Sequence, residues 1–354
     1  MRNSENTRKA FLELVKAGLW GNGNPDIRID GTTDWQEVYR LATEQSVLGL
    51  VLDGLEHSDV KPPQVLLLQW IGEVQMIEQR NKAMNQFVAE LVEKMRTADI
   101  YAILVKGQGV AQCYEKPLWR PSGDVDFLLS EVNYKKAKVL LLPLSSSNKN
   151  EERYSQHLGM SIGQWYVEIH GSLRTGLSTR VDKEVDAAQN SVFIGGNVRS
   201  WHNTQVFLPA PTEDVFLVFT HFIKHFYKEG MSLRQVCDWC RLLWTYRTEI
   251  KVEWLELHLR KTGLMKEWKV FAALAVQYLG MPVEAMPFFN LNDNVGLNKK
   301  ATKLMEFILG GYSGNKIKDT LRIAKIFPWK ALWYSPSIFL NVNWLKIRER
   351  IFKR

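Results

Sequence analysis

Cysteine is scarce in this chain of 354 residues, which holds Cys113, Cys237 and Cys240 and no others. A small, odd number without regular spacing argues against a disulfide-stabilised fold and is typical of a reducing compartment. Cys237 and Cys240 form a C-x-x-C pair, but the pair lies in a helical pattern and no second pair follows. We therefore expect a buried structural pair, with a zinc or redox site as the less favoured alternative.

Long apolar runs are also absent. No stretch approaches the ~20 consecutive apolar residues that a membrane-spanning helix needs. The opening residues, MRNSENTRKAFLELV, lack the apolar core of a signal peptide. We expect a cytoplasmic protein without a transmembrane span. The composition is otherwise that of a globular protein, with 45% hydrophobic and 24% charged residues, and the chain is long enough for two or three structural units.

Net charge is absent from most of the chain, although the total is +8. Residues 316–354 carry ten Lys and Arg against two acids, so the first 315 residues are neutral overall. The cations of this tail alternate with aromatic residues such as Trp329, Trp333 and Trp344, a mixture that could bind an anionic membrane surface or nucleic acid. The alternative is that the aromatic residues pack on the protein while the cations stay in solvent.

Two short apolar runs lie on either side of a glycine turn near the middle of the chain. Residues 103–105 predict a buried strand that breaks at Gly107, and a second strand is predicted at 125–129. Asp124 and Asp126 stand at the start of this second strand. Side chains two apart on a strand share a face, so we expect the two carboxylates to lie together. Such a pair needs a proton or a cation, and Mg²⁺ is the usual ion for oxygen-only ligands.

A third acid follows in the strand pattern at residues 164–170. Glu168 lies between Val167 and Ile169, where a charged side chain is expected only if it faces a site or solvent. Each acid alone is more often a solvated strand residue than a ligand. Together, the three are candidate ligands of one metal site.

These residues resemble a known superfamily. A glycine turn after a strand, D-h-D on the next strand and a later acid between apolar residues are similar to the nucleotidyltransferases typified by DNA polymerase beta. More narrowly, K-G, R-P-S-G-D-V-D and V-E-I-H resemble the bacterial branch described as uncharacterised nucleotidyltransferases, over about residues 95–245. The chain departs from the superfamily pattern at Gly107-Gln108, where glycine is usually followed by glycine or serine.

The resemblance implies transfer of a nucleoside monophosphate from an NTP, ATP among them, to a hydroxyl of an acceptor, with Mg²⁺ as cofactor. It implies that Asp124, Asp126 and Glu168 are both the catalytic residues and the metal ligands. Cations, hydroxyls and an open turn suit phosphate oxygens. The candidate nucleotide-binding residues are therefore Lys106, Gly107, Arg120 and Ser122. For Arg120, a surface ion pair is the alternative interpretation.

Two later helices carry polar residues four apart. His221 and His225 share a face as either a metal pair or a polar stripe against the strands, and the stripe is favoured because the H-E-x-x-H glutamate is missing. Arg234 and Asp238 can pair within the next helix, and the family looks to carry a similar L-R-x-x-x-D-W helix. We place His170, His221, Arg234 and Asp238 in a second tier of site residues.

The order of elements predicts an α+β protein, with a small mixed-sheet nucleotidyltransferase core between helical domains. The predicted units are 1–98, 99–210, 211–310 and a basic aromatic tail at 311–354. A loop is expected at 21–32. Helices are expected from a cap at Asn6 or Thr7, from a cap at Thr33 or Asp34 to residue 55, and at 64–97 with Pro62 or Pro63 in the first turn. Further helices are expected at 109–114 and 131–141, from a cap at Thr212, at 233–248 and through 252–310. Strands are expected at 103–105, 125–129, 157–162, 164–170 and 204–208, with a break at 143–147.

Two other classes of function are consistent with the residues. A regulatory module could bind nucleotide without turnover, as the changed turn at Gly107-Gln108 suggests. A histidine-metal hydrolase could use His170, His221 and His225, and it would hold Zn²⁺ or Mn²⁺ tightly. The acceptor is not encoded in any motif: a sugar phosphate, a small alcohol, a protein hydroxyl and a tRNA end all remain open.

Overall fold

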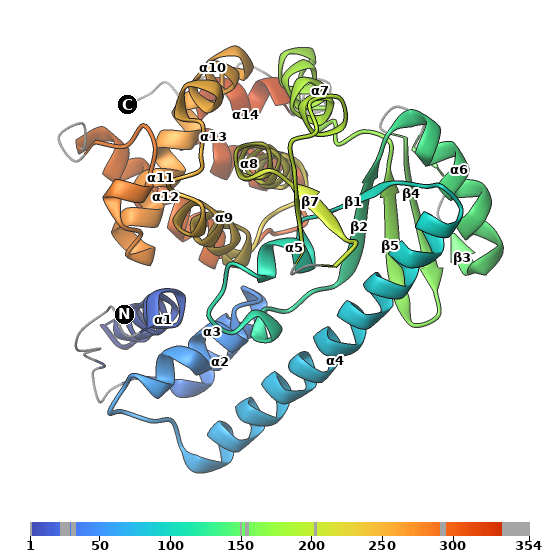
Figure 1. The fold of residues 1–354 in the computed structure, drawn as a ribbon. Helices are drawn as coiled ribbons and strands as arrows, with labels where there is room; N and C mark the ends of the chain where they lie inside the picture. Colours follow the sequence, from blue (N-terminus) through green and yellow to red (C-terminus); the bar gives the residue numbers. More distant parts are fainter. Residues whose placement is uncertain are drawn as a thin grey trace.

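The structure is a computed structural model that describes residues 2–21, 29, 33–148, 151–152, 156–201, 204–290 and 295–334. Within these ranges, fourteen α-helices accompany one seven-stranded mixed sheet (Figure 1). The helices are α1 (Arg2–Trp20), α2 (Trp35–Glu44), α3 (Leu48–Glu56), α4 (Gln64–Thr97), α5 (Gly107–Ala111), α6 (Glu131–Leu141), α7 (Thr179–Phe193), α8 (Pro211–Lys228), α9 (Leu233–Thr245), α10 (Val252–Thr262), α11 (Met265–Leu279), α12 (Val295–Leu309), α13 (Lys316–Ala324) and α14 (Pro328–Tyr334). The predicted combination of a mixed sheet with many helices is confirmed.

The sheet has the strand order β3-β4-β5-β2-β1-β7-β6. Its strands are β1 (Ala102–Val105), β2 (Asp124–Leu129), β3 (Ser145–Asn148), β4 (His157–Ile162), β5 (Trp165–His170), β6 (Val198–Ser200) and β7 (Phe207–Pro209). The central pair, β2 and β5, is parallel, and its register sets Asp126 opposite Glu168. Two acids far apart in the sequence are therefore neighbours in the sheet.

One face of the sheet is covered by α6 and the C-terminal half of α4. Val125 and Phe127 of β2 and Val167 of β5 are buried there, in one hydrophobic cluster with Val88 of α4 and Ala137 of α6. Because side chains alternate along a strand, the residues between them must face the other way. The apolar face thus directs the acids of β2 and β5 away from this core.

A second hydrophobic core joins helices from both ends of the chain. It contains Phe11 of α1, Phe222 of α8, Trp239 of α9 and Phe271 of α11. The indole of Trp20 also donates a hydrogen bond to the carbonyl oxygen of Leu279. Helices at the two ends of the chain therefore support one another, and the division of the chain into four units stays a prediction.

The described part of the basic tail packs onto this core. Ile323, Phe327 and Tyr334 are buried, whereas Trp329 and Trp333 are 68% and 73% exposed. The alternative interpretation, in which the aromatic residues of the tail pack on the protein, thus holds for Phe327 and Tyr334 and is wrong for Trp329 and Trp333. The rest of the predicted tail, with Trp344, lies outside the described residues, as does nearly all of the loop predicted at 21–32.

Several predicted boundaries are wrong at the N-terminal end. Helix α1 runs through Thr7 instead of starting there, and the Thr7 hydroxyl accepts a hydrogen bond from the backbone N–H of Asp34 at 3.1 Å. Asp34 caps α2 as predicted, accepting from two backbone N–H groups. The helix expected at 34–55 is instead two helices, because Ser46 adopts a φ of 55° between them.

Other corrections concern segments whose structure depends on distant partners. The serine run predicted as a break forms β3 at the sheet edge, where it pairs with β4. Neither α7 nor β6 was expected. Ala210 takes the N-cap position of α8, and the Thr212 hydroxyl instead accepts from the backbone N–H of Lys251 at 2.9 Å. Helix α9 ends at Thr245, and the short helix after β1 begins at Gly107.

Glycines let α1 and α3 pack backbone against backbone. A Cβ atom at Gly18 of α1 would overlap the carbonyl of Leu50, and one at Gly54 of α3 would overlap the carbonyl of Leu14.

We expect Gly18→Ala to lower the free energy of unfolding by about 1–3 kcal/mol, since the helices must move apart. Gly72→Ala on α4 is the matched control, because no atom lies near its Cβ position. Urea denaturation should show that Gly72→Ala is more stable than the native protein by ~1 kcal/mol, because alanine has the higher helix propensity. Equal stability of the two variants would contradict this packing.

Candidate active site

Three carboxylates meet on the face of the sheet that points away from α4 and α6. Asp124 and Asp126 come from β2 and Glu168 comes from the adjacent strand β5. One carboxylate oxygen from each residue can be chosen so that the three oxygens lie within 4.8 Å of one another. Asp126 is buried, and the other two are partly buried. Oxygen-only donors this close together suit a hard divalent cation. We call these residues the acid group.

Two basic side chains contact one oxygen of Asp126. The Lys106 ammonium lies 2.8 Å from Oδ1, and Nε2 of His170 lies 2.8 Å from the same atom. Burial acts to raise the pKa of Asp126, but Lys106 and His170 outweigh it and hold this pKa well below its usual range. The charge of Asp126, together with burial, raises the pKa of Asp124. The acid group is thus partly neutralised by the protein itself.

Glu168 is held by a pair of stacked histidines. Its Oε2 lies 3.1 Å from Nε2 of His157 and 3.5 Å from Nε2 of His170. The two imidazole rings are parallel, with centroids 4.6 Å apart. The close contact with the Glu168 carboxylate raises the pKa of His157. His157 was not predicted from the sequence; it reaches the site because the register of β4 and β5 sets it opposite His170.

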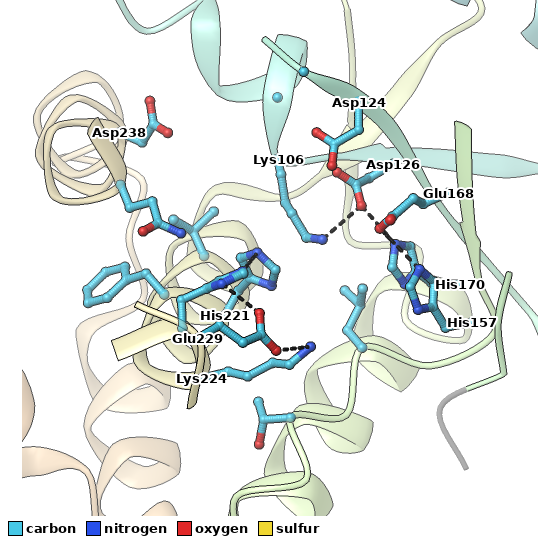
Figure 2. A pocket seen from close by; sticks show the side chains of 18 of the residues that line it. Lys106, Asp124, Asp126, His157, Glu168, His170, His221, Lys224, Glu229 and Asp238 are labelled. Carbon is cyan, nitrogen blue, oxygen red and sulfur yellow. Dashed lines mark hydrogen bonds and ion pairs between the residues drawn. The ribbon is translucent and has the colours of Figure 1, made fainter. Parts of the chain in front are cut away.

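The acid group forms one wall of a cavity of about 630 Å³ (Figure 2). This volume lies within the range of pockets that hold small ligands and cofactors. With the exception of Ser122, every site residue predicted from the sequence lines it. These residues are Lys106, Gly107, Arg120, Asp124, Asp126, Glu168, His170, His221, Arg234 and Asp238.

Arg120 reaches this cavity as half of a buried ion pair with Asp238. Its Nε and Nη2 atoms donate to the two carboxylate oxygens of Asp238 at 3.0 and 2.7 Å, and the Tyr114 hydroxyl donates at 2.7 Å. A surface ion pair for Arg120 is therefore wrong. The predicted pairing within α9 is confirmed, with Arg234 at 3.4 Å from Asp238. Ser122 accepts a hydrogen bond from Arg120.

The histidines of α8 contact each other. Their Nε2 atoms are 2.9 Å apart, and Nδ1 of His225 lies 2.9 Å from Glu229. Among the described residues, the groups of three potential metal ligands are the acid group and the set of His157, Glu168 and His170. Neither contains His221 or His225, so the polar-stripe interpretation is favoured and a histidine hydrolase is not supported.

The predicted burial of Cys237 and Cys240 is confirmed, and both thiols are free.

The helix α8 carries two cavity residues that the sequence analysis missed. Lys224 and Lys228 line the cavity beside His221 and His225. The four residues have the spacing i, i+3, i+4, i+7, which places them on one helix face. This spacing is the sequence signal that could have found them. Arg174 in the loop after β5 also lines the cavity, and it carried no local signal.

The residue that departs from the superfamily turn points away from the cavity. Gln108 is buried, and its amide contacts the sulfur of Met84 on α4. Lys106 and Gly107 have positive φ angles of 57° and 31°, a backbone conformation that is unusual for lysine. This turn brings Lys106 to Asp126, while Gln108 anchors the start of α5 to α4.

Comparison with known proteins adds the family. The model of the family described as uncharacterised nucleotidyltransferase matches residues 31–280, well over half of the chain. The protein belongs to this family, as the sequence motifs predicted. The link to DNA polymerase beta and a bacterial origin stay predictions. No curated protein and no solved structure matches the chain. None of the helices in the described residues combines the length and the apolar character needed to cross a bilayer.

Proposed function

We propose that this protein is a Mg²⁺-dependent nucleotidyltransferase that moves a nucleoside monophosphate from an NTP to a hydroxyl group of an acceptor. The observation that carries this proposal is the acid group, whose three carboxylates come within 4.8 Å of one another in the wall of a cavity. Membership of a nucleotidyltransferase family supports the type of reaction. The cavity is also large enough for a nucleotide.

The donor set fits a divalent cation, with Asp124, Asp126 and Glu168 as the residues that would hold it. All three offer oxygen, the ligand that Mg²⁺ prefers. Lys106 and His170 now balance part of the negative charge at Asp126, which shows where positive charge is needed. A bound Mg²⁺ would neutralise the triphosphate and polarise the reacting phosphate.

The remaining residues position the two substrates. Arg120 is held in place by Asp238, and with Arg234 it presents guanidinium groups to phosphate oxygens near Asp124. Glu168, oriented by His157 and His170, accepts the proton of the acceptor hydroxyl. The acceptor oxygen then bonds to the α-phosphorus of the NTP, and pyrophosphate leaves. In-line displacements of this kind depend on positioning and charge neutralisation.

The proposal includes the layout of the chain. Residues 99–210 are the nucleotidyltransferase core, 1–98 and 211–310 the flanking helical regions, and 311–354 the basic tail. The scarcity of cysteine supports a cytoplasmic location.

A regulatory module that binds nucleotide without turnover is the second candidate. One observation favours it: the ammonium of Lys106 lies 2.8 Å from Asp126 Oδ1, where a metal ligand would be expected to be free. Such a module would need the cavity and its arginines but not the acid group.

Calorimetric titration of each NTP, with and without Mg²⁺, tests the proposed site. We expect Mg²⁺-dependent binding to the native protein and its loss in the Asp124→Asn, Asp126→Asn double variant, since the metal ligands are gone. Glu131→Gln is the matched control, because Glu131 lies outside the cavity on the exposed surface of α6. Equal nucleotide affinity in the double variant and the native protein would contradict a metal-dependent site.

A further inference from the structure

The cavity holds a second set of cations that the proposed reaction does not use. Lys224 and Lys228 lie one turn apart on α8, and the loop 172–176 after β5 lines the cavity with them. In Figure 2, Lys224 lies on the opposite side of the cavity from Asp124 and Asp126. Lys224 is therefore separate from the acid group, and Lys228 contacts the loop 172–176 instead of the Arg120–Asp238 pair.

Lys228 is fixed in place by the loop that follows β5. Its ammonium donates to the carbonyl oxygens of Thr175 and Gly176 at 3.1 and 2.7 Å. The loop is fixed in turn by the buried carboxylate of Asp182, which accepts from the Thr175 hydroxyl and from the backbone N–H groups of Thr175 and Gly176. A lysine ammonium has three N–H donors. In the part of the chain that the structure describes, these two carbonyls are the hydrogen-bond acceptors of Lys228, so one donor is left for a ligand at a position that is already set.

The charge around these lysines is only partly balanced. Among the described residues, no carboxylate lies within ion-pair distance of Lys228, and Lys224 has Glu229 at 3.5 Å. Burial, followed by the charge of Lys224, lowers the pKa of Lys228. A bound anion would offset both effects. The positive charge of Lys224 and Lys228 on α8 thus favours the binding of a negatively charged group.

The position of these two lysines separates them from the expected triphosphate. Arg120 and Arg234 lie by Asp238 of α9, and Gly107 follows β1. Lys228 instead contacts the loop after β5, the strand that carries Glu168. Glu168 is the acid that we place on the acceptor side. An anion at Lys224 and Lys228 would therefore belong to the acceptor.

We propose that Lys224 and Lys228 bind an anionic oxygen group of the acceptor, a phosphate monoester or a carboxylate. The acceptor is then a small hydroxyl compound that carries this group at one end and presents its hydroxyl to Glu168. This inference rests on the proposed nucleotidyl transfer. Of the acceptors that the sequence leaves open it favours a sugar phosphate, and it adds hydroxy acids as a second class of charged metabolite.

The test is calorimetric titration of inorganic phosphate, and separately of acetate, into protein saturated with Mg²⁺ and a non-hydrolysable ATP analogue. We expect at least one of these anions to bind while the analogue stays bound. Its Kd should rise at least ~10-fold in Lys228→Gln and in Lys224→Gln, since each variant loses a charge-assisted contact. Lys183→Gln, on the exposed surface of α7, should leave this Kd unchanged.

Three results would overturn the inference: no binding of either anion, an anion that displaces the analogue, or lysine variants that weaken the analogue instead of the anion. Lys224→Gln guards against a folding artefact, because among the described residues the loop 172–176 is hydrogen-bonded by Lys228, whereas Lys224 pairs with Glu229. Failure of the analogue to bind, with anion binding still dependent on Lys228, would contradict the nucleotidyltransferase proposal and leave an anion site of another purpose.

Discussion

Replacing Asp126 with asparagine is expected to abolish nucleotide transfer. Asp126 is the most buried of the acid group, and it lies opposite Glu168 in the sheet and two residues from Asp124. In the proposed function it is a ligand of the metal that all three acids hold. Loss of a residue that only orients a metal ligand lowers metal affinity about 10–100-fold, so loss of a ligand itself should lower this affinity more than ~100-fold. Mn²⁺ affinity measured by electron paramagnetic resonance should fall by at least this factor. Pyrophosphate release from ATP in the presence of a metabolite extract should fall to background.

This variant also separates the two proposed functions. A regulatory module would keep its affinity for nucleotide in Asp126→Asn, whereas the enzyme should lose both metal binding and turnover. Removal of the carboxylate leaves Lys106 without its partner, so thermal unfolding must first show that the variant is folded. Glu131→Gln should match the native protein in both assays, and pyrophosphate release by Asp126→Asn at the native rate would rule out the acid group as the metal site.

The Asp238→Asn variant is expected to lose more stability than any surface charge variant. Asp238 is 5% exposed and accepts from Arg120 and Tyr114. Asparagine would leave Arg120 buried without its counter-ion, and breaking a buried pair in this way costs about 3–5 kcal/mol. Urea denaturation at neutral pH should show this loss. Glu256→Gln breaks an exposed pair with Arg260 on α10, and it should cost only ~0.3–0.5 kcal/mol.

The pH dependence of this effect has a defined sign. Burial acts to raise the pKa of Asp238, but Arg120 outweighs it and the pKa lies below its ordinary value. A lowered carboxyl pKa stabilises the fold above the unfolded pKa of ~3.9 and loses that effect as pH falls through the folded pKa. The difference between the native protein and Asp238→Asn should therefore be constant near neutral pH and shrink below about pH 4. If Asp238→Asn loses no more stability at neutral pH than Glu256→Gln does, Asp238 does not stabilise the fold as a buried counter-ion of Arg120.

Elements with strong local signals could be predicted from the sequence. Helices α4 and α6 begin and end where the prolines at 62–63 and the apolar periodicity place them. The hairpin of β4 and β5 turns at Gly163, whose φ of 59° suits glycine. The acids of β2 and β5 could be found because a strand period of two directs alternate residues to one face.

Features that depend on partners distant in sequence could not be predicted. The serine run of β3 becomes a strand only because β4 offers an edge to pair with. His157 joins the site through the register of β4 and β5, and Arg120 finds Asp238 across 118 residues. The shared core of the first and last helices likewise depends on contacts that no local pattern encodes.

The central claim is that Asp124, Asp126 and Glu168 hold a divalent metal against a nucleotide. A crystal structure with Mn²⁺ and a non-hydrolysable ATP analogue tests it most directly, since manganese scatters anomalously and can stand in for Mg²⁺. We predict an anomalous peak between these three carboxylates, with the phosphates of the analogue in contact with the same ion. An analogue bound with no metal at the acid group, or a metal bound elsewhere in the cavity, would contradict the claim.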